Sequence, residues 1–140
     1  IGYADDYELC LFAQLAGYKI YYSDKLLLTH IIPPGKLNFD YLKANMFKQG
    51  YSSVMVDPLI VITEGLSNKN KYWLFIKQII NCIKEIILLL PKITFSRDRK
   101  KKLDYNYNKG RLAHLICSVY YYQYRFEEVR LIYQKLNPSD

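Results

Sequence analysis

A chain of 140 residues with 51% hydrophobic residues is long enough to bury a core and too apolar to be intrinsically disordered. Its formal net charge of +7 predicts an anionic partner, with nucleic acid, phospholipid and phosphorylated substrates as the candidate classes. The three cysteines are too widely and irregularly spaced for a disulfide framework or a CxxC zinc site. Composition therefore predicts a globular piece without a cysteine-based site.

The N-terminal region predicts one helix followed by two short strands. Apolar residues recur at helical spacing over 5–16, and Gly17 is placed to end that helix. The β-branched and aromatic residues at 18–22 predict a strand, and 26–30 predict a second short strand or extended segment. Two prolines directly after this segment predict a loop.

The middle of the chain predicts a capped helix and then a boundary. Asn38 is a good N-cap for a helix over 39–49. Gly50 is expected to interrupt this helix, with 51–56 continuing it after a kink. The change of composition that follows predicts two parts, residues 1–66 and 67–140.

The C-terminal part predicts long helices joined by a basic hinge. An amphipathic pattern predicts a helix over 71–90 that Pro91 ends. Residues 91–103 form the expected hinge, and most of the net charge lies between residues 92 and 111. A last, tyrosine-rich helix is expected over about 109–136.

Three carboxylates stand close together near the start of the chain, at Asp5, Asp6 and Glu8. Acidic residues are favoured at helix N-termini, so Asp5 as N-cap and Glu8 in a capping box is one interpretation, and spacing alone favours it. A carboxylate at a helix N-terminus that opens into a cleft can instead act as a general base. One residue of the pair can cap while its neighbour does chemistry.

The order of residues around these acids favours the second interpretation. The segment ADDYELCLFAQLAGYKIYYSDKLLLTHIIPPGKL (4–37) resembles the C-terminal part of the catalytic domain of family 2 glycosyltransferases, the inverting GT-A enzymes of bacterial surface polysaccharide synthesis. The shared features are an acidic pair, an E-L dipeptide, a Gly-Tyr, an apolar strand, a histidine and a proline loop with a basic residue. The resemblance covers the first third to two-fifths of the chain.

The resemblance implies roles for four residues. Asp6 would be the general base toward the acceptor hydroxyl, and Asp5, where the family more often has glutamate, would support it. His30 would lie near the nucleotide diphosphate and its divalent metal, as a possible metal ligand, and Lys36 would contact a phosphate. From the residues alone, His30 is as readily a structural histidine, and Lys36 is an ordinary surface lysine.

The resemblance also implies a fold and a reaction. The expected fold is an α/β fragment, mostly helical: the C-terminal portion of a GT-A-like domain, with a helix and short strands, followed by a helical extension. The chain lacks the nucleotide-binding first half and its Asp-x-Asp motif, so we expect a C-terminal piece that is inactive alone. The whole transferase would use a nucleotide-sugar donor, Mn²⁺ or Mg²⁺ bound mostly by the missing half, and a glycan or lipid-linked acceptor.

The helical extension predicts membrane association without a membrane span. The 71–90 segment has about the length of a span, roughly 20 residues, but contains Lys77, Lys84 and Glu85. An interfacial helix at an anionic membrane surface, on the cytoplasmic side of the plasma membrane, is the expected location. A plain helical hairpin remains an alternative for this part, and a non-enzymatic membrane- or protein-binding module for the whole chain. No nucleic-acid motif accompanies the basic residues, so nucleic acid is not an expected partner.

Overall fold

The computed structural model describes residues 5–27, 29, 31–65, 70–95 and 98–138, with the Asp5 side chain left out. These residues form six α-helices and one short 3₁₀ helix, η1. In chain order the elements are α1 (Asp5–Leu15), η1 (Pro34–Lys36), α2 (Phe39–Ser53), α3 (Asp57–Thr63), α4 (Lys71–Phe95), α5 (Arg99–Cys117) and α6 (Val119–Leu136).

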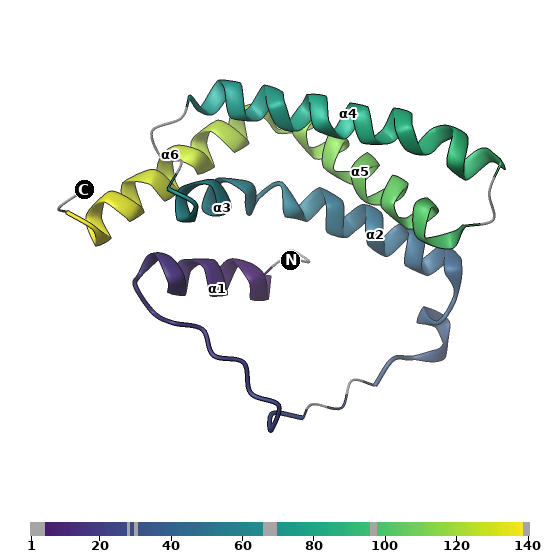
Figure 1. Cartoon of the computed structure of the whole chain (residues 1–140), viewed down its shortest axis with the longest axis horizontal. Helices are drawn as coiled ribbons and strands as arrows, with labels where there is room; N and C mark the ends of the chain where they lie inside the picture. Colours follow the sequence, from purple (N-terminus) through teal and green to yellow (C-terminus); the bar gives the residue numbers. More distant parts are fainter. Residues whose placement is uncertain (1–4, 28, 30, 66–69, 96–97, 139–140) are drawn as a thin grey trace.

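The helices stack in layers around the C-terminal pair α5 and α6 (Figure 1). On one side α4 contacts both α5 and α6. On the other side α2 contacts α5, and α3 contacts α6. The helix α1 packs on the outer side of α3, so it is one layer further from α4. Helices from before and after residue 66 therefore pack against each other.

The first helix ends where the sequence predicts. Gly17 has a φ of +81°, which costs glycine little because it lacks a Cβ. Its N–H donates to the Gln14 carbonyl, and the Tyr18 N–H donates to the Ala13 carbonyl, each at 3.0 Å. This pair of bonds is the Schellman pattern, and the prediction that Gly17 stops the helix is confirmed.

The predicted α/β fragment with the short strands of a GT-A-like domain is wrong. The described residues are 78% helical and contain no strand. A strand exists only when a neighbouring segment completes its hydrogen-bond ladder. Residues 18–22 lie exposed, with Tyr21 83% and Tyr22 94% accessible, and Leu27 in the second segment is 89% accessible. Residues of high β-propensity favour a half-buried sheet surface. The described part of the chain provides no such surface for these residues.

The second helix runs through Gly50 without interruption, contrary to the sequence prediction. Gly50 faces the backbone of α5, and Gly110 of α5 faces the backbone of α2. A Cβ added at Gly50 would lie 2.0 Å from the Tyr107 carbonyl oxygen, and one at Gly110 would lie 2.0 Å from that of Phe47. Both glycines therefore serve close helix packing, whereas the sequence pattern alone predicts a helix break at Gly50.

The C-terminal helices also differ in their ends from the prediction. Helix α4 continues one turn past Pro91, to Phe95. Helix α5 begins at Arg99, ten residues before the predicted 109, so the basic hinge is largely helical. The Asp98 carboxylate accepts from the backbone N–H groups of Lys100 (2.9 Å) and Lys101 (3.3 Å), which is N-cap geometry. The predicted last helix is divided at Ser118 into α5 and α6.

Among the described helices, none combines the length and apolar character needed to cross a membrane. This agrees with the expectation that the 71–90 segment is not a span.

Two apolar clusters hold most of the buried side chains. The first joins α1, α3 and α6 and contains Leu11, Leu15, Val56, Leu59, Ile62 and Val129. The second joins α4, α5 and α6 with the end of α2 and contains Val54, Phe75, Cys82, Leu115 and Tyr122. Since α6 contributes to both, it connects the N-terminal helix to the C-terminal bundle.

The predicted N-cap of α2 is confirmed and supplies a first test. The Asn38 side chain accepts from the Tyr41 backbone N–H at 2.7 Å and donates to the Gly35 carbonyl at 2.7 Å. We expect Asn38→Ala to lower the free energy of unfolding by about 1 kcal/mol, measured by urea denaturation, because the helix loses its cap. Asn38→Gly is the control and should cost only a few tenths of a kcal/mol. Equal stability of the alanine variant and the parent would show that this cap contributes nothing.

Candidate functional site

The four residues predicted from the resemblance have different outcomes in the structure. Asp5 is the first residue of α1, and its side chain lies outside the described part. Asp6 lies in the first turn of the same helix and is exposed. His30 lies outside the described residues. Lys36 is the last residue of η1 and is exposed.

The two neighbouring acids on α1 have separate environments. The Glu8 carboxylate forms an ion pair with the guanidinium of Arg125 on α6. Arg125 also donates to Glu128 at 2.6 Å and lies over the ring of Phe12, 5.4 Å from its centroid. Glu8 thus fastens the start of α1 to α6. Asp6 is exposed and has no ion-pair partner within the described residues.

Lys36 is not brought to Asp6 by the described helices. Its Nζ lies 5.9 Å from the ring centroid of Tyr41, a cation–π contact within the η1–α2 region. Whereas α1 packs on α3, η1 contacts α2, and Figure 1 shows η1 near the end of α2 that is remote from α3. A phosphate-binding role for Lys36 beside Asp6 stays a prediction.

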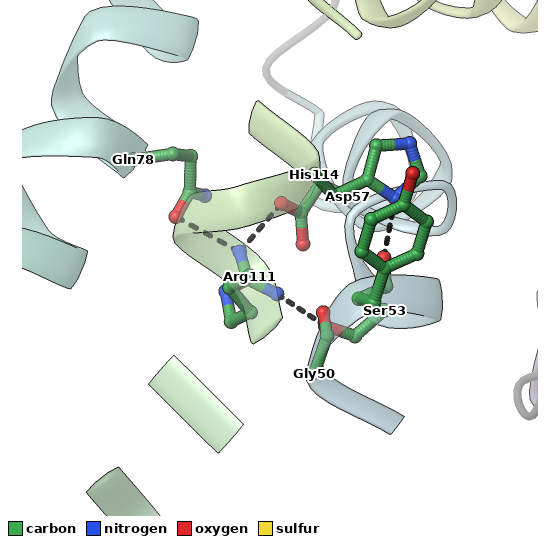
Figure 2. A network of polar contacts seen from close by, with 7 residues as sticks. Gly50, Ser53, Asp57, Gln78, Arg111 and His114 are labelled. Carbon is green, nitrogen blue, oxygen red and sulfur yellow. Dashed lines mark hydrogen bonds and ion pairs between the residues drawn. The ribbon is translucent and has the colours of Figure 1, made fainter. Parts of the chain in front are cut away.

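A second group of polar residues, which the sequence analysis did not predict, is buried between the helices (Figure 2). The Arg111 guanidinium on α5 donates to the Asp57 carboxylate at 2.6 Å and to the Ser53 hydroxyl at 2.7 Å. It also donates to the Gln78 side-chain oxygen on α4, at 3.2 Å. The Ser53 hydroxyl in turn donates to the Gly50 carbonyl at 2.8 Å. One guanidinium therefore connects α2, α3, α4 and α5.

The electrostatics of this group follow from its burial. Burial raises the pKa of the Asp57 carboxyl, and the Arg111 guanidinium opposes this shift. Burial lowers the pKa of Arg111, but the Asp57 carboxylate outweighs it and holds that pKa above its ordinary value. Burial also raises the pKa values of the nearby Tyr122 hydroxyl and Cys82 thiol, so both remain protonated at neutral pH. Neither is a ready nucleophile.

His114 belongs to the same interface. Its Nδ1 lies 2.5 Å from the Tyr51 carbonyl oxygen, so Nδ1 carries the hydrogen and donates. The ring of His114 stacks on the ring of Tyr51, with centroids 4.2 Å apart and an angle of 27° between the planes. Only 5% of His114 is exposed. Its burial, its hydrogen bond and its stacking indicate a structural role for His114.

The buried group is suited to holding helices together and not to catalysis. Asp57 is 6% exposed, and its ion pair with Arg111 joins α3 to α5 inside the packed helices. Sequence reasoning missed the group because Asp57 and Arg111 are 54 positions apart and share no motif. The local sequence signals only a helix start here, since Pro58 directly after Asp57 suits the first turn of α3.

No metal site can be assembled from the described residues. Among them, no three His, Cys, Asp or Glu side chains are grouped so that they could hold an ion. The divalent metal that the resemblance implies therefore stays a prediction about residues outside the described part, His30 included.

Comparison of the chain with models of protein families, with curated proteins and with solved structures finds no match.

Proposed function

We propose that this chain is the C-terminal part of a glycosyltransferase that moves a sugar from a nucleotide-sugar donor to a hydroxyl acceptor. In this proposal Asp6 is the general base, and Asp5 supports it. The observation that carries the proposal is the exposed Asp6 carboxylate in the first turn of α1, beside a Glu8 that is held in an ion pair. A carboxylate needed only for packing would be expected to resemble Glu8.

The chemistry that Asp6 would perform is a single displacement. The carboxylate takes the proton of the acceptor hydroxyl as the acceptor oxygen forms its bond to the anomeric carbon of the sugar. The bond between that carbon and the nucleotide diphosphate breaks, and the diphosphate leaves with the electron pair. This displacement inverts the anomeric configuration. His30 and Lys36 are proposed to contact the leaving diphosphate.

The exposed apolar residues after α1 support a chain that is completed by a further part. Residues 18–32 carry large apolar side chains in the open: Ile20, Tyr21, Tyr22, Leu26, Leu27, Ile31 and Ile32. Many exposed large apolar side chains within one segment indicate a contact site in a soluble protein. We propose that the nucleotide-binding part of the transferase covers it.

The test is activity of the full-length transferase that contains these residues, with Asp6→Asn as the variant. We expect kcat to fall by a factor of about 10² to 10⁴, the usual contribution of a general base, while binding of the nucleotide sugar is retained. Transfer is measured across a panel of nucleotide sugars with Mn²⁺ or Mg²⁺, and nucleotide binding by calorimetry.

Two control variants separate chemistry from folding. Asp40→Asn makes the same chemical change at an exposed position in the first turn of α2, outside the 18–32 segment, and should leave kcat unchanged. Glu8→Gln removes the ion pair with Arg125 and should lower the melting temperature with a smaller effect on kcat. Undiminished turnover in a folded Asp6→Asn transferase would remove Asp6 as the base.

A further inference from the structure

Helix α4 has two apolar faces, and only one of them is used by the fold. The inner face buries Leu74, Phe75, Cys82 and Leu89 against the rest of the bundle. The other face is exposed, with Ile76 53%, Ile80 57% and Ile87 59% accessible. Its members recur at alternating steps of four and three residues, which keeps them on one side of the helix. We call this the outer stripe, and it consists of Trp73, Ile76, Ile80, Ile83, Ile87 and Leu90.

The outer stripe is long and hollowed. From Trp73 to Leu90 it covers about 25 Å of helix, at 1.5 Å per residue. A shallow apolar hollow on it is lined by Ile80, Ile83, Ile87, Leu88 and the stem of Lys84. Figure 1 shows α4 as the outermost layer, so no other described helix covers its far side. An exposed apolar surface of this extent marks a contact site.

Lysines border the stripe on one edge. Lys77 and Lys84 are both exposed and lie one helical turn from stripe residues. The Lys77 Nζ lies 5.1 Å from the centroid of the Trp73 ring. Lys92 follows further along the helix and is also exposed. The acidic residue of this helix, Glu85, is separated from the stripe by the lysine edge.

The charge of this edge decides between the candidate occupants. If the outer stripe packed on the outer stripe of a second copy, the lysines of both copies would border the same interface. The stripe contains no carboxylate that could pair with them. An anionic lipid surface complements them, since lysine stems cover apolar surface while their ammonium groups reach the headgroups. Trp73, at one end of the stripe, has the amphipathic ring that is enriched at the boundary between acyl chains and headgroups.

From this arrangement we propose that α4 docks in the plane of an anionic phospholipid membrane, with the outer stripe in the acyl boundary and Lys77 and Lys84 at the headgroups. The proposal is independent of the glycosyltransferase function, because it requires neither donor sugar nor catalysis.

The experiment is flotation of the chain with vesicles of phosphatidylcholine alone and of phosphatidylcholine with phosphatidylglycerol. We expect binding to the anionic vesicles that falls as salt is added. The double variant Ile80→Ser/Ile87→Ser should lower the partition coefficient at least tenfold, because it removes two central apolar side chains from the stripe. The double variant Lys77→Gln/Lys84→Gln should also lower it about tenfold or more, and only for anionic vesicles.

Two control variants make equivalent substitutions at exposed positions away from the outer stripe. Leu42→Ser/Leu131→Ser removes two exposed leucines from α2 and α6, and Lys109→Gln/Lys135→Gln removes the same charge from exposed positions on α5 and α6. Both should leave binding within about twofold of the parent, since the membrane contribution is local to the surface that docks. Circular dichroism verifies that every variant is folded.

Three results would overturn the proposal. One is no binding of the parent chain to either vesicle. Another is equal loss of binding in the Lys77→Gln/Lys84→Gln variant and in its control Lys109→Gln/Lys135→Gln, which would show adhesion by net charge only. The third is a parent dimer, detected by analytical ultracentrifugation, that the Ile80→Ser/Ile87→Ser variant dissociates while its vesicle binding is unchanged. That result would assign the stripe to a second copy of the chain.

Discussion

Gly50→Ala is expected to lower the free energy of unfolding by about 3 kcal/mol or more, measured by urea denaturation followed by circular dichroism. The added Cβ would lie 2.0 Å from the Tyr107 carbonyl oxygen, and a backbone atom cannot rotate away. Helices α2 and α5 would have to separate, which also disturbs the Arg111 contact to Ser53. Gly110→Ala should have the same effect, through the Phe47 carbonyl.

The sign of the change in the free energy of unfolding shows whether the two helix backbones are in contact. In a helix without close packing, alanine in place of glycine stabilises by about 0.5–1 kcal/mol. A Gly50→Ala variant that unfolds at the same or a higher urea concentration than the parent would therefore show that the two backbones are not in contact. Gly35→Ala is the matched control, because nothing lies within 4 Å of its added Cβ and its φ is not positive. It should change stability by less than about 0.5 kcal/mol.

Arg111→Met is the second substitution with a large expected effect, a loss of about 3–5 kcal/mol in the free energy of unfolding. The Arg111 and Asp57 side chains are only 11% and 7% exposed, so removal of one leaves the other charged group buried without its partner. Ser53 and Gln78 lose a donor at the same time. Chemical denaturation measures the loss.

A double-mutant cycle separates the cost of an orphaned charge from the net value of the pair. Asp57→Leu with Arg111→Met replaces both charges, so we expect it to cost clearly less than the sum of the two single variants. Strict additivity would show that the two groups do not interact. Lys43→Met is the control, since its pair with Asp40 is at the surface and should contribute less than about 1 kcal/mol.

The candidate site was only partly predictable from the sequence. The acidic residues at the start of α1 were identified by their order relative to the Gly-Tyr and the histidine that follow. Their different environments were not, because the partner of Glu8 is Arg125, 117 positions away. The outer stripe of α4 could be read as part of an amphipathic pattern. Which of its two apolar faces is covered depends on where α5 and α6 pack.

The sequence by itself determined features that depend on hydrogen bonds and dihedral angles within a few residues. These are the end of α1 at Gly17, the cap of α2 at Asn38 and the start of α4 at residue 71. Where a local sequence signal is compatible with more than one structure, the tertiary packing decided which structure formed. Gly50 continues a helix because another helix backbone lies against it, and residues 18–22 form no strand because no described segment pairs with them. The physical reason is that a ladder, a backbone contact or a buried ion pair needs a partner distant in the chain, and a local pattern does not specify that partner.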